Sequence, residues 1–494
     1  MDKKRKKALI AMSGGVDSSV AAALMLQEGY ECIGCTMKLL GNAEGAAAKT
    51  EKSIESGARR SPHTCCSLDD VEDARSVARK LGMPYYVFNF SSDFDEKVIG
   101  RFVKVYQAGG TPNPCIDCNR YMKFGRLFYR AQELGCDVVV TGHYARTRFD
   151  EKSGRWQLLR VKRPDMEQEF ESSHVRMNSQ DGERNRDSIF NQVSGDDRYS
   201  DKDQTYVLYA MTQEQLAHVK FPLGEYADKE EVRQIADQYG FVNSHKPDSQ
   251  DICFVPDGKY ADFIERRTGQ KASCGDFVDE EGHVLGTHKG LIRYTIGQRR
   301  GLGLALPAPL YVSRIDTQKN QVVLTPEDRL YSRRLVAEDF NWIWTPDWGE
   351  WADHSCKSTL SGLEKQSDLS HGQNRTKAGE KETGREEAGE KDTGREEAEE
   401  KDTGREEAGV TGFGAAGGVD NAVPPVGYTC VVTVKPRYRA KEAAATAKVL
   451  EGGNVEIVFH EPQRALTIGQ AVVLYAGDNV VGGGTIREVF PASE

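Results

Sequence analysis

The stretch "IAMSGGVDSSVAAALML" (residues 10–26) joins a short apolar run to a helical pattern through a loop of serine and glycine. Gly14 and Gly15 allow close backbone approach and unusual φ angles. Ser18 and Ser19 stand where the helix is expected to begin, and the N–H groups and dipole of a helix start attract anions. The loop is therefore predicted to hold a phosphate group. A tight strand-to-helix turn with packing glycines is the alternative.

The loop differs from the two commonest phosphate-binding loops. It lacks the Gly-Lys-Ser/Thr ending of one and the Gly-x-Gly-x-x-Gly spacing of the other, so no lysine within it would reach a γ-phosphate. Asp17 would repel a bare phosphate unless it serves a magnesium ion or the amine and hydroxyl groups of a nucleotide.

Length and composition indicate an ordinary globular protein of two or three domains, since the 494 residues are 38% hydrophobic and 29% charged. The basic start "MDKKRKK" precedes only a short apolar strand, and no stretch approaches the length of a membrane span. We therefore expect a cytoplasmic protein with reduced cysteines and no membrane partner. Its eleven cysteines then suggest metal or redox chemistry rather than a disulfide framework.

The formal net charge of −10 comes largely from one segment, a decapeptide repeated three times over residues 379–408. The segment has no large apolar residue, so it is predicted to be a solvated insert. It is either a disordered tether or an acidic arm that binds a partner. The rest of the chain is closer to neutral, which leaves room for basic patches that bind nucleic acid.

The first 145 residues alternate strand and helix patterns. Such alternation predicts a mostly parallel sheet covered by helices, with ligands bound at the carboxyl ends of the strands. Strands are expected at 8–12, 31–40, 85–90 and 136–145, and helices at 18–28, 68–82, 93–106 and 126–135.

Downstream, short helices follow Tyr206, and hairpin patterns with Gly and Asn turns begin near residue 276. The predicted fold class is α/β, with a Rossmann-like parallel sheet, a small central domain and a C-terminal all-β, barrel-like domain. The expected domains are 1–215 with polar inserts at 41–63 and 164–200, then 216–285, then 286–494 with the repeat insert at about 357–425.

Two cysteines stand out as candidate nucleophiles. In "GGTPNPCIDCNRYMKFG" (109–125) the prolines indicate an extended loop, and a helix is expected after Asn119. A cysteine at a helix N-terminus has a lowered pKa and more of the nucleophilic thiolate, which favours Cys118. Cys253 lies far downstream in "SHKPDSQDICFVP" (244–256). The cysteines expected to be inert are Cys32, Cys35, Cys136, Cys274, Cys356 and Cys430.

The motif SGGVDSS resembles the PP-loop of N-type ATP pyrophosphatases, which hold the leaving pyrophosphate of ATP and transfer AMP. Together with TPNP…CN…KFG, TGHYA, KDQ…L and SQDICF, in that order, it makes the chain resemble the tRNA-specific 2-thiouridylases. The resemblance covers nearly the whole chain apart from the three inserts. It implies ATP and Mg²⁺ as cofactors, adenylation of O2 of the flipped wobble uridine (U34), and persulfide transfer that yields 2-thiouridine.

The resemblance also implies roles for individual residues. Cys253 would receive sulfur as a persulfide from a sulfur donor protein or a cysteine desulfurase. Cys118 would be the nucleophile that completes the transfer, leaving a Cys118–Cys253 disulfide. The partner would be a tRNA of the Lys, Glu or Gln type. The implied ATP contacts are Met12, Ser13, Gly14, Gly15, Val16, Asp17, Ser18, Ser19, Met37 and Gly142. The implied contacts to the target base or tRNA are Asn113, Pro114, Cys115, His143, Lys202, Asp203, Gln204, Arg437, Tyr438 and Gln470.

Several points stay open at this stage. Many relatives have an acidic residue where this chain has Cys115, so Cys115 and Cys118 form a C-x-x-C pair. That pair could be half of a zinc or iron–sulfur site, or Cys115 could be a spare thiol or have an auxiliary redox role. The segment "VKPRYRAKE" (434–442) is expected to be a basic strand that contacts RNA or is simply solvated. The rival functions are another PP-loop ligase or amidotransferase, and a non-catalytic RNA-binding scaffold with a structural metal.

Overall fold

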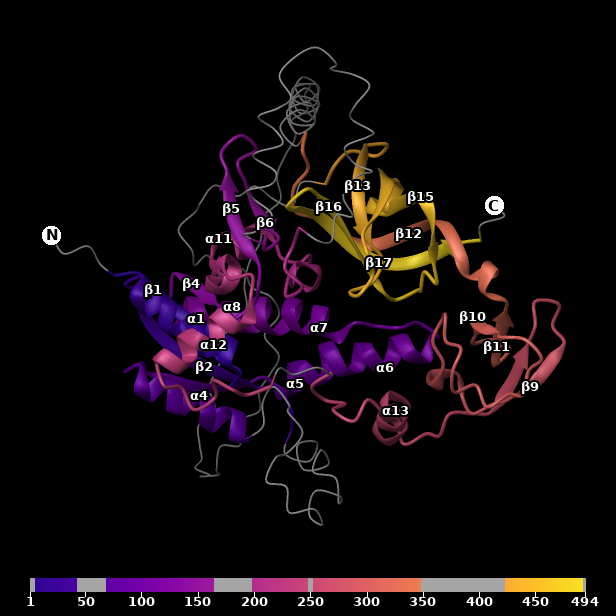
Figure 1. Ribbon diagram of the computed structural model, residues 1–494, viewed down its shortest axis with the longest axis horizontal. Coiled ribbons are helices and arrows are strands. Elements are labelled where there is room, and N and C mark those ends of the chain that lie inside the picture. Colours follow the sequence, from indigo (N-terminus) through magenta and orange to yellow (C-terminus); the bar gives the residue numbers. More distant parts are fainter. Residues whose placement is uncertain (1–4, 42–67, 164–197, 248–251, 348–422, 492–494) are drawn as a thin grey trace, which may run out of the picture. The chain divides into compact units, whose positions relative to one another are not determined.

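The computed structural model (Figure 1) describes residues 5–41, 68–163, 198–247, 252–347 and 423–491, all within one compact unit. The 379–408 repeat and Cys356 lie outside these residues, as do nearly all of the three predicted inserts.

The N-terminal part contains the expected parallel sheet. Its strand order is β3-β2-β1-β4-β7, and every neighbouring pair is parallel. The strands are β1 (Lys7–Ala11), β2 (Glu31–Lys38), β3 (Tyr85–Asn89), β4 (Val138–Val140) and β7 (Val219–Lys220). The prediction of a parallel sheet is confirmed, and β7 adds an edge strand that the sequence did not indicate.

Three of the described helices pack with this sheet and contribute apolar side chains to its core. They are α1 (Val16–Gln27), α4 (Leu68–Lys80) and α12 (Lys229–Gln238). Most of α1 is small and fully buried, including Ala21, Ala22 and Ala23, so the helix lies close against β1 and α12. Val77 of α4 and Val232 of α12 complete the same core cluster.

A run of short helices connects β3 to β4. It comprises α5 (Ser91–Phe94), the π-helical turn η1 (Asp95–Ile99), α6 (Gly100–Gln107), α7 (Pro114–Asp117), the π-helical segment η2 (Cys118–Arg126) and α8 (Leu127–Glu133). The expected helix start after Asn119 is wrong. The helix begins at Pro114, because the Asn113 side chain accepts a hydrogen bond from the Cys115 N–H and proline suits the first helical position. Cys118 therefore lies beyond the first turn and not at the N-terminus.

The remaining strands form two sheets. The smaller one has the order β10-β11-β8-β9 around a core that includes Phe277 and Val312. Its strands are β8 (Gly275–Val278), β9 (Val284–His288), β10 (Tyr311–Asp316) and β11 (Gln321–Thr325). The domain limits at 215 and 285 stay predictions, although the parallel sheet continues past the first and this small sheet spans the second.

The larger sheet closes on itself, because β12 pairs with both β15 and β17. The ring, drawn in orange to yellow in Figure 1, contains β12 (Tyr331–Trp342), β13 (Thr429–Lys435), β14 (Ala443–Val449), β15 (Val455–Arg464), β16 (Ala471–Ala476) and β17 (Asn479–Phe490). The expected C-terminal barrel is confirmed. An unforeseen hairpin, β5 (Arg146–Asp150) and β6 (Arg155–Leu159), joins it where Leu159 pairs with Asn479.

Short elements complete the described chain: η3 (Thr205–Val207), α11 (Gln213–Ala217), η4 (Pro222–Glu225), α13 (Tyr260–Thr268), η5 (Leu291–Arg293), η6 (Glu327–Leu330) and η7 (Glu451–Gly453).

A buried cation ties the barrel to the segment before η3. Arg160, which follows β6, is 1% exposed and forms ion pairs with Glu442 and Asp203. Its guanidinium also lies 3.5 Å from the ring centroid of Tyr199 and 4.9 Å from that of Tyr475. The two carboxylates come from distant parts of the sequence, so this one arginine neutralises both and holds the segments together.

Replacing this arginine should destabilise the protein strongly. We expect Arg160→Met to cost on the order of 3 kcal/mol, because it leaves two buried carboxylates without their cation. A lowered Tm would show the effect. The control is Arg130→Met, which breaks the exposed Arg130–Glu133 pair and should change Tm very little. Equal Tm values for both variants would contradict this role for Arg160.

Candidate functional site

The SGG loop leaves the carboxyl end of β1 and enters α1 through a tight turn. Gly14 has φ +74°, and a Cβ at this position would lie 2.3 Å from the backbone oxygen of Asp70, so the turn requires glycine. Gly15 is the N-cap of α1 and makes no side-chain cap. The hydroxyls of Ser18 and Ser19 instead donate to the Gly15 carbonyl at 3.0 and 3.1 Å. The first N–H groups of α1 are thus left uncapped, as an anion site needs.

Other residues implied as ATP contacts surround this loop. Gly142 lies against the helix start, since a Cβ there would be 2.8 Å from the Ser18 nitrogen. Met12 is buried, and its N–H donates to the Cys35 carbonyl at 2.7 Å. Met37 is half-buried near the carboxyl end of β2. The structure therefore brings these parts of the chain together at one edge of the sheet.

The structure also places two lysines at the loop that the sequence did not single out. The Lys229 Nζ lies 2.5 Å from Oδ2 of Asp17, while the Tyr144 hydroxyl donates to Oδ1 at 2.8 Å. Lys246 donates to the Gly14 carbonyl at 3.2 Å. The negative charge of Asp17 is thus balanced by a cation from α12. No spacing signal could have revealed a partner 212 positions away.

Cys115 and Cys118 lie in consecutive helical turns, Cys115 exposed and Cys118 half-buried. Their helix is attached to α6, because Arg101 pairs with Asp117 at 3.5 Å. The segment of Cys253 also meets α6, where the Phe254 ring packs edge-on against Phe102. Both candidate catalytic cysteines therefore belong to segments that pack on the same short helix.

A small polar cavity lies beside α7. Its charged and polar lining consists of Arg101, Asn113, Asp117, Arg120, Tyr209, Asp339 and Thr485. Burial raises the pKa of Asp117 from 3.8 to about 6, and this effect outweighs the opposing influence of the Arg101 and Arg120 guanidinium groups. Asn113, implied as a contact of the target base, thus lies at an opening that already holds paired charges.

The implied tRNA contacts fall into two groups. Buried or tied side chains form the first group. His143 bonds to Thr141 at 2.7 Å, and burial lowers its pKa well below 6.5, so it is neutral. Asp203 accepts bonds from the Val161 N–H and the Thr205 hydroxyl.

Two amides belong to the same group. Gln204 accepts from the Tyr144 N–H at 3.0 Å, and Gln470 donates to the Thr111 carbonyl at 2.9 Å. The side chains of this first group are therefore held in place by hydrogen bonds within the protein.

The second group is accessible. Arg437 is exposed, and Tyr438 is 42% exposed while its ring packs edge-on against Tyr206 at 5.6 Å. Lys202 is half-buried. The predicted strand over 434–442 is wrong, because β13 ends at Lys435 and the next strand starts at Ala443. The basic residues therefore lie on a loop, where their side chains can point in different directions.

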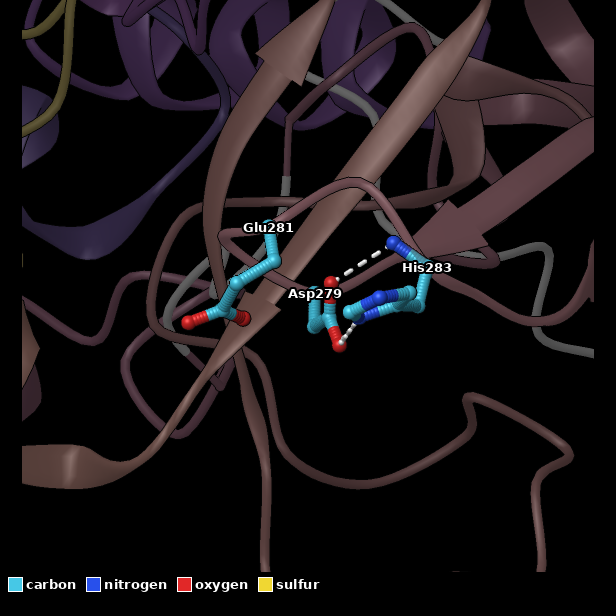
Figure 2. Close-up of side chains that lie close together, drawn as sticks. All are labelled: Asp279, Glu281 and His283. Atoms are coloured by element: carbon cyan, nitrogen blue, oxygen red, sulfur yellow. Dashed lines mark hydrogen bonds and ion pairs between the residues drawn. The ribbon is translucent and has the colours of Figure 1, made fainter.

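Among the residues that the structure describes, one cluster has potential metal ligands within reach of one another: Asp279, Glu281 and His283 (Figure 2). They lie in the turn between β8 and β9. Asp279 accepts bonds from the His283 N–H at 2.7 Å and pairs with its Nδ1 at 2.9 Å. These contacts close the turn, and the cluster contains neither candidate cysteine.

The geometry defines the class first. A parallel sheet with an SGG loop at its carboxyl edge, followed by a four-stranded sheet and a closed barrel, describes a nucleotide-binding α/β protein with two appended β modules. Family models match in the same order: the tRNA methyl transferase HUP domain at 6–181 and 178–257, the tRNA methyl transferase PRC-barrel domain at 261–326, and the Aminomethyltransferase beta-barrel domain at 422–486.

Curated relatives named tRNA-specific 2-thiouridylase MnmA match almost from end to end. The protein of Acetivibrio thermocellus is 38% identical over 483 residues, 98% of this chain and 99% of the relative. That of Moorella thermoacetica is 39% identical over 481 residues, 97% and 99% of the two chains. The chain therefore belongs to the tRNA-specific 2-thiouridylase family.

A solved structure, NMN synthetase from Francisella tularensis, aligns with 55% of this chain and 79% of its own, at 11% identity and a TM-score of 0.25, which is too low to argue from. Within the described ranges, no helix combines the length and apolar character needed to cross a membrane.

The raised pKa of Asp117 predicts a pH-dependent stability. The folded protein holds this proton more tightly than the unfolded chain, so the carboxyl contributes stability below about pH 4 that is lost as the pH rises through about 6. Asp117→Asn removes the charge and should stabilise the protein at pH 8, by on the order of 2 kcal/mol relative to its effect at pH 4. Tm measured at both pH values tests this.

The matched control is Asp201→Asn, because the Asp201 side chain is 87% exposed. Its Tm should differ from that of the parent protein by the same small amount at both pH values. A Tm difference for Asp117→Asn that does not change with pH would show that Asp117 is not buried as described.

Proposed function

We propose that this protein is an ATP-dependent sulfurtransferase that converts the wobble uridine of tRNA to 2-thiouridine. The observation that carries the proposal is its membership, over 98% of its length, of a family named for 2-thiouridylation of tRNA. Two features of the chain support it: the SGG loop lies at the ligand-binding edge of a parallel sheet, and both required cysteines are present.

The first step is the activation of the base. The uridine leaves its stack, its O2 attacks the α-phosphate of ATP, and pyrophosphate departs. The uncapped N-terminus of α1 and the glycine turn suit the pyrophosphate, because their N–H groups donate to anions. Magnesium prefers carboxylate and phosphate oxygens, and Asp17 is the carboxylate of the loop. Both of its oxygens are engaged, by the Tyr144 hydroxyl and by Lys229, so Asp17 would hold the ion only if one of these contacts were exchanged for it.

The second step delivers sulfur. A donor protein or a cysteine desulfurase loads Cys253 as a persulfide. The Cys118 thiolate attacks the Cys253 sulfur, the terminal sulfur leaves and bonds to C2 of the uridine, and AMP departs with the former O2. A Cys118–Cys253 disulfide remains and is reduced for the next turnover. The common packing of both segments on α6 supports this pairing.

The tRNA surface includes the loop between β13 and β14. Arg437, Arg439 and Lys441 are exposed on it, with Tyr438 beside them. Cations contact phosphates, and an accessible aromatic ring can stack on an unpaired base. The proposed substrate is a tRNA of the Lys, Glu or Gln type, and the proposed partner is a sulfur donor protein or a cysteine desulfurase.

Substituting either cysteine should separate activation from sulfur transfer. We expect Cys118→Ser and Cys253→Ser to abolish 2-thiouridine formation, measured by mass spectrometry of tRNA nucleosides, because serine forms no persulfide and is a poor nucleophile at neutral pH. Both variants should retain tRNA-stimulated exchange between ATP and pyrophosphate.

The control is Cys274→Ser, an exposed cysteine to which the proposal gives no role, and this variant should keep full activity. Full turnover retained by Cys118→Ser would instead favour another PP-loop ligase or amidotransferase, which needs no pair of separated cysteines. The absence of any ATP–pyrophosphate exchange by the parent protein would favour an RNA-binding scaffold.

The basic loop should contribute a salt-dependent part of tRNA affinity. We expect Arg437→Gln to weaken tRNA binding several-fold and to reduce the slope of log K against log salt concentration by about 1, as loss of one phosphate contact predicts. Filter binding at several salt concentrations measures this. Arg148→Gln is the control, because Arg148 is bonded to Gln157 within the β5–β6 hairpin. An unchanged slope for Arg437→Gln would place this loop outside the interface.

A further inference from the structure

The carbonyl oxygen of Gly14 accepts hydrogen bonds from two side chains of a segment that is remote in sequence. Asn243 Nδ2 donates to the Gly14 oxygen at 2.9 Å, and Lys246 Nζ donates to it at 3.2 Å. Asn243 is 2% exposed, and its Nδ2 also donates to the Ser19 hydroxyl at 3.0 Å. Since a carbonyl oxygen can only accept, the contact fixes which end of the Asn243 amide faces the loop.

The position of this carbonyl decides the direction of the next N–H. In a planar trans peptide the C=O of one residue and the N–H of the next point in opposite directions. The Gly14 carbonyl points toward Asn243 and Lys246, so the Gly15 N–H points to the other side of the loop. This N–H has no hydrogen-bond acceptor among the described residues. The turn can flip easily at glycine, so an anchor is needed to keep this donor outward.

We propose that Asn243 and Lys246 are positioning residues that lock the Gly14 carbonyl and thereby aim the Gly15 N–H at the pyrophosphate of the bound nucleotide. The inference rests on the proposed function for the identity of that anion. Neither residue needs to touch the nucleotide, because their effect passes through one peptide plane. Electrostatic preorganisation of this kind spares the loop from reorienting when the ligand arrives.

The surroundings of the two side chains support a dedicated anchor. Lys246 also donates to Asp70 at 2.6 Å and to Asp73 at 2.7 Å, so its ammonium group is fixed in place. Burial alone would lower the pKa of Lys246, but these two carboxylates outweigh burial and raise it, so the cation persists. The Oδ1 atom of Asn243 is buried with no partner in the described part of the protein, so the two hydrogen bonds of its Nδ2 orient the side chain.

The test measures pyrophosphate affinity in the full chain. In Asn243→Asp a carboxylate faces the Gly14 oxygen in place of a donor, and in Lys246→Met the cation is lost with little change in volume. Calorimetric titration with inorganic pyrophosphate, without tRNA, should show affinity reduced five- to tenfold in each variant. In the tRNA-stimulated exchange assay, the KM for pyrophosphate should rise by the same factor, while kcat falls less.

The chain offers a matched control. Lys80 Nζ donates to the Gly240 carbonyl at 2.6 Å, so Lys80→Met removes a lysine–carbonyl bond from the same downstream segment without touching the loop. This variant should bind pyrophosphate as the parent does. An equal loss of affinity in Lys80→Met would overturn the proposal, because any loosening of the segment would then suffice. Pyrophosphate affinity within twofold of the parent in both loop variants would also overturn it.

Failure of the proposed function has a different signature. If the parent protein binds pyrophosphate but tRNA stimulates no ATP–pyrophosphate exchange, the proposed function fails. The positioning role of Asn243 and Lys246 is then still tested by the calorimetric affinities. Should Asn243→Asp fail to fold, Lys246→Met decides alone, with Tm reported for each variant.

Discussion

The hydrogen bonds that place β1 in the middle of a parallel sheet determine where the SGG loop and the residues around it lie. Because β1 pairs with β2 on one side and β4 on the other, the SGG loop emerges at the carboxyl edge between its neighbours. Met37 at the end of β2 and Gly142 after β4 reach the same place for the same reason. The position of the proposed nucleotide site is thus a consequence of strand order, and the glycines only allow the turn to be tight.

Charge around the loop is supplied from outside it. The motif contains a carboxylate and no cation, yet Asp17 meets Lys229, and the Gly14 carbonyl meets Lys246. Both lysines belong to the segment that continues toward Cys253. One stretch of the chain therefore both contacts the SGG loop and leads to Cys253, the cysteine to which the proposed function assigns the persulfide. Under the proposed function, this arrangement is a physical reason for activation and sulfur transfer to occupy a single polypeptide.

Local pattern sufficed for β1, β2, β3 and β4 of the parallel sheet, because buried apolar runs alternating with amphipathic helices leave few other folds, but it did not indicate the two-residue edge strand β7. The start of the helix at Pro114 was missed although its signal was present: Asn113 followed by proline is a strong N-cap pair. The basic segment at 434–442 was assigned as a strand from its composition, whereas Pro436 ends β13. Asn243, Lys229 and Lys246 could not be found from sequence, because their roles arise only from contacts over more than 200 positions.

The β5–β6 hairpin has a consequence for dissecting the molecule. It belongs by sequence to the nucleotide-binding half, but β6 pairs with β17, and the fully buried Arg155 donates to the Ile343 carbonyl. A fragment that ends before the barrel would lack β17 and the Ile343 carbonyl. The hairpin would then have an unpaired strand edge, and the Arg155 guanidinium would lose its buried partner. Such a truncated half is a natural candidate for self-association through that edge, so the two halves are better studied as one intact polypeptide.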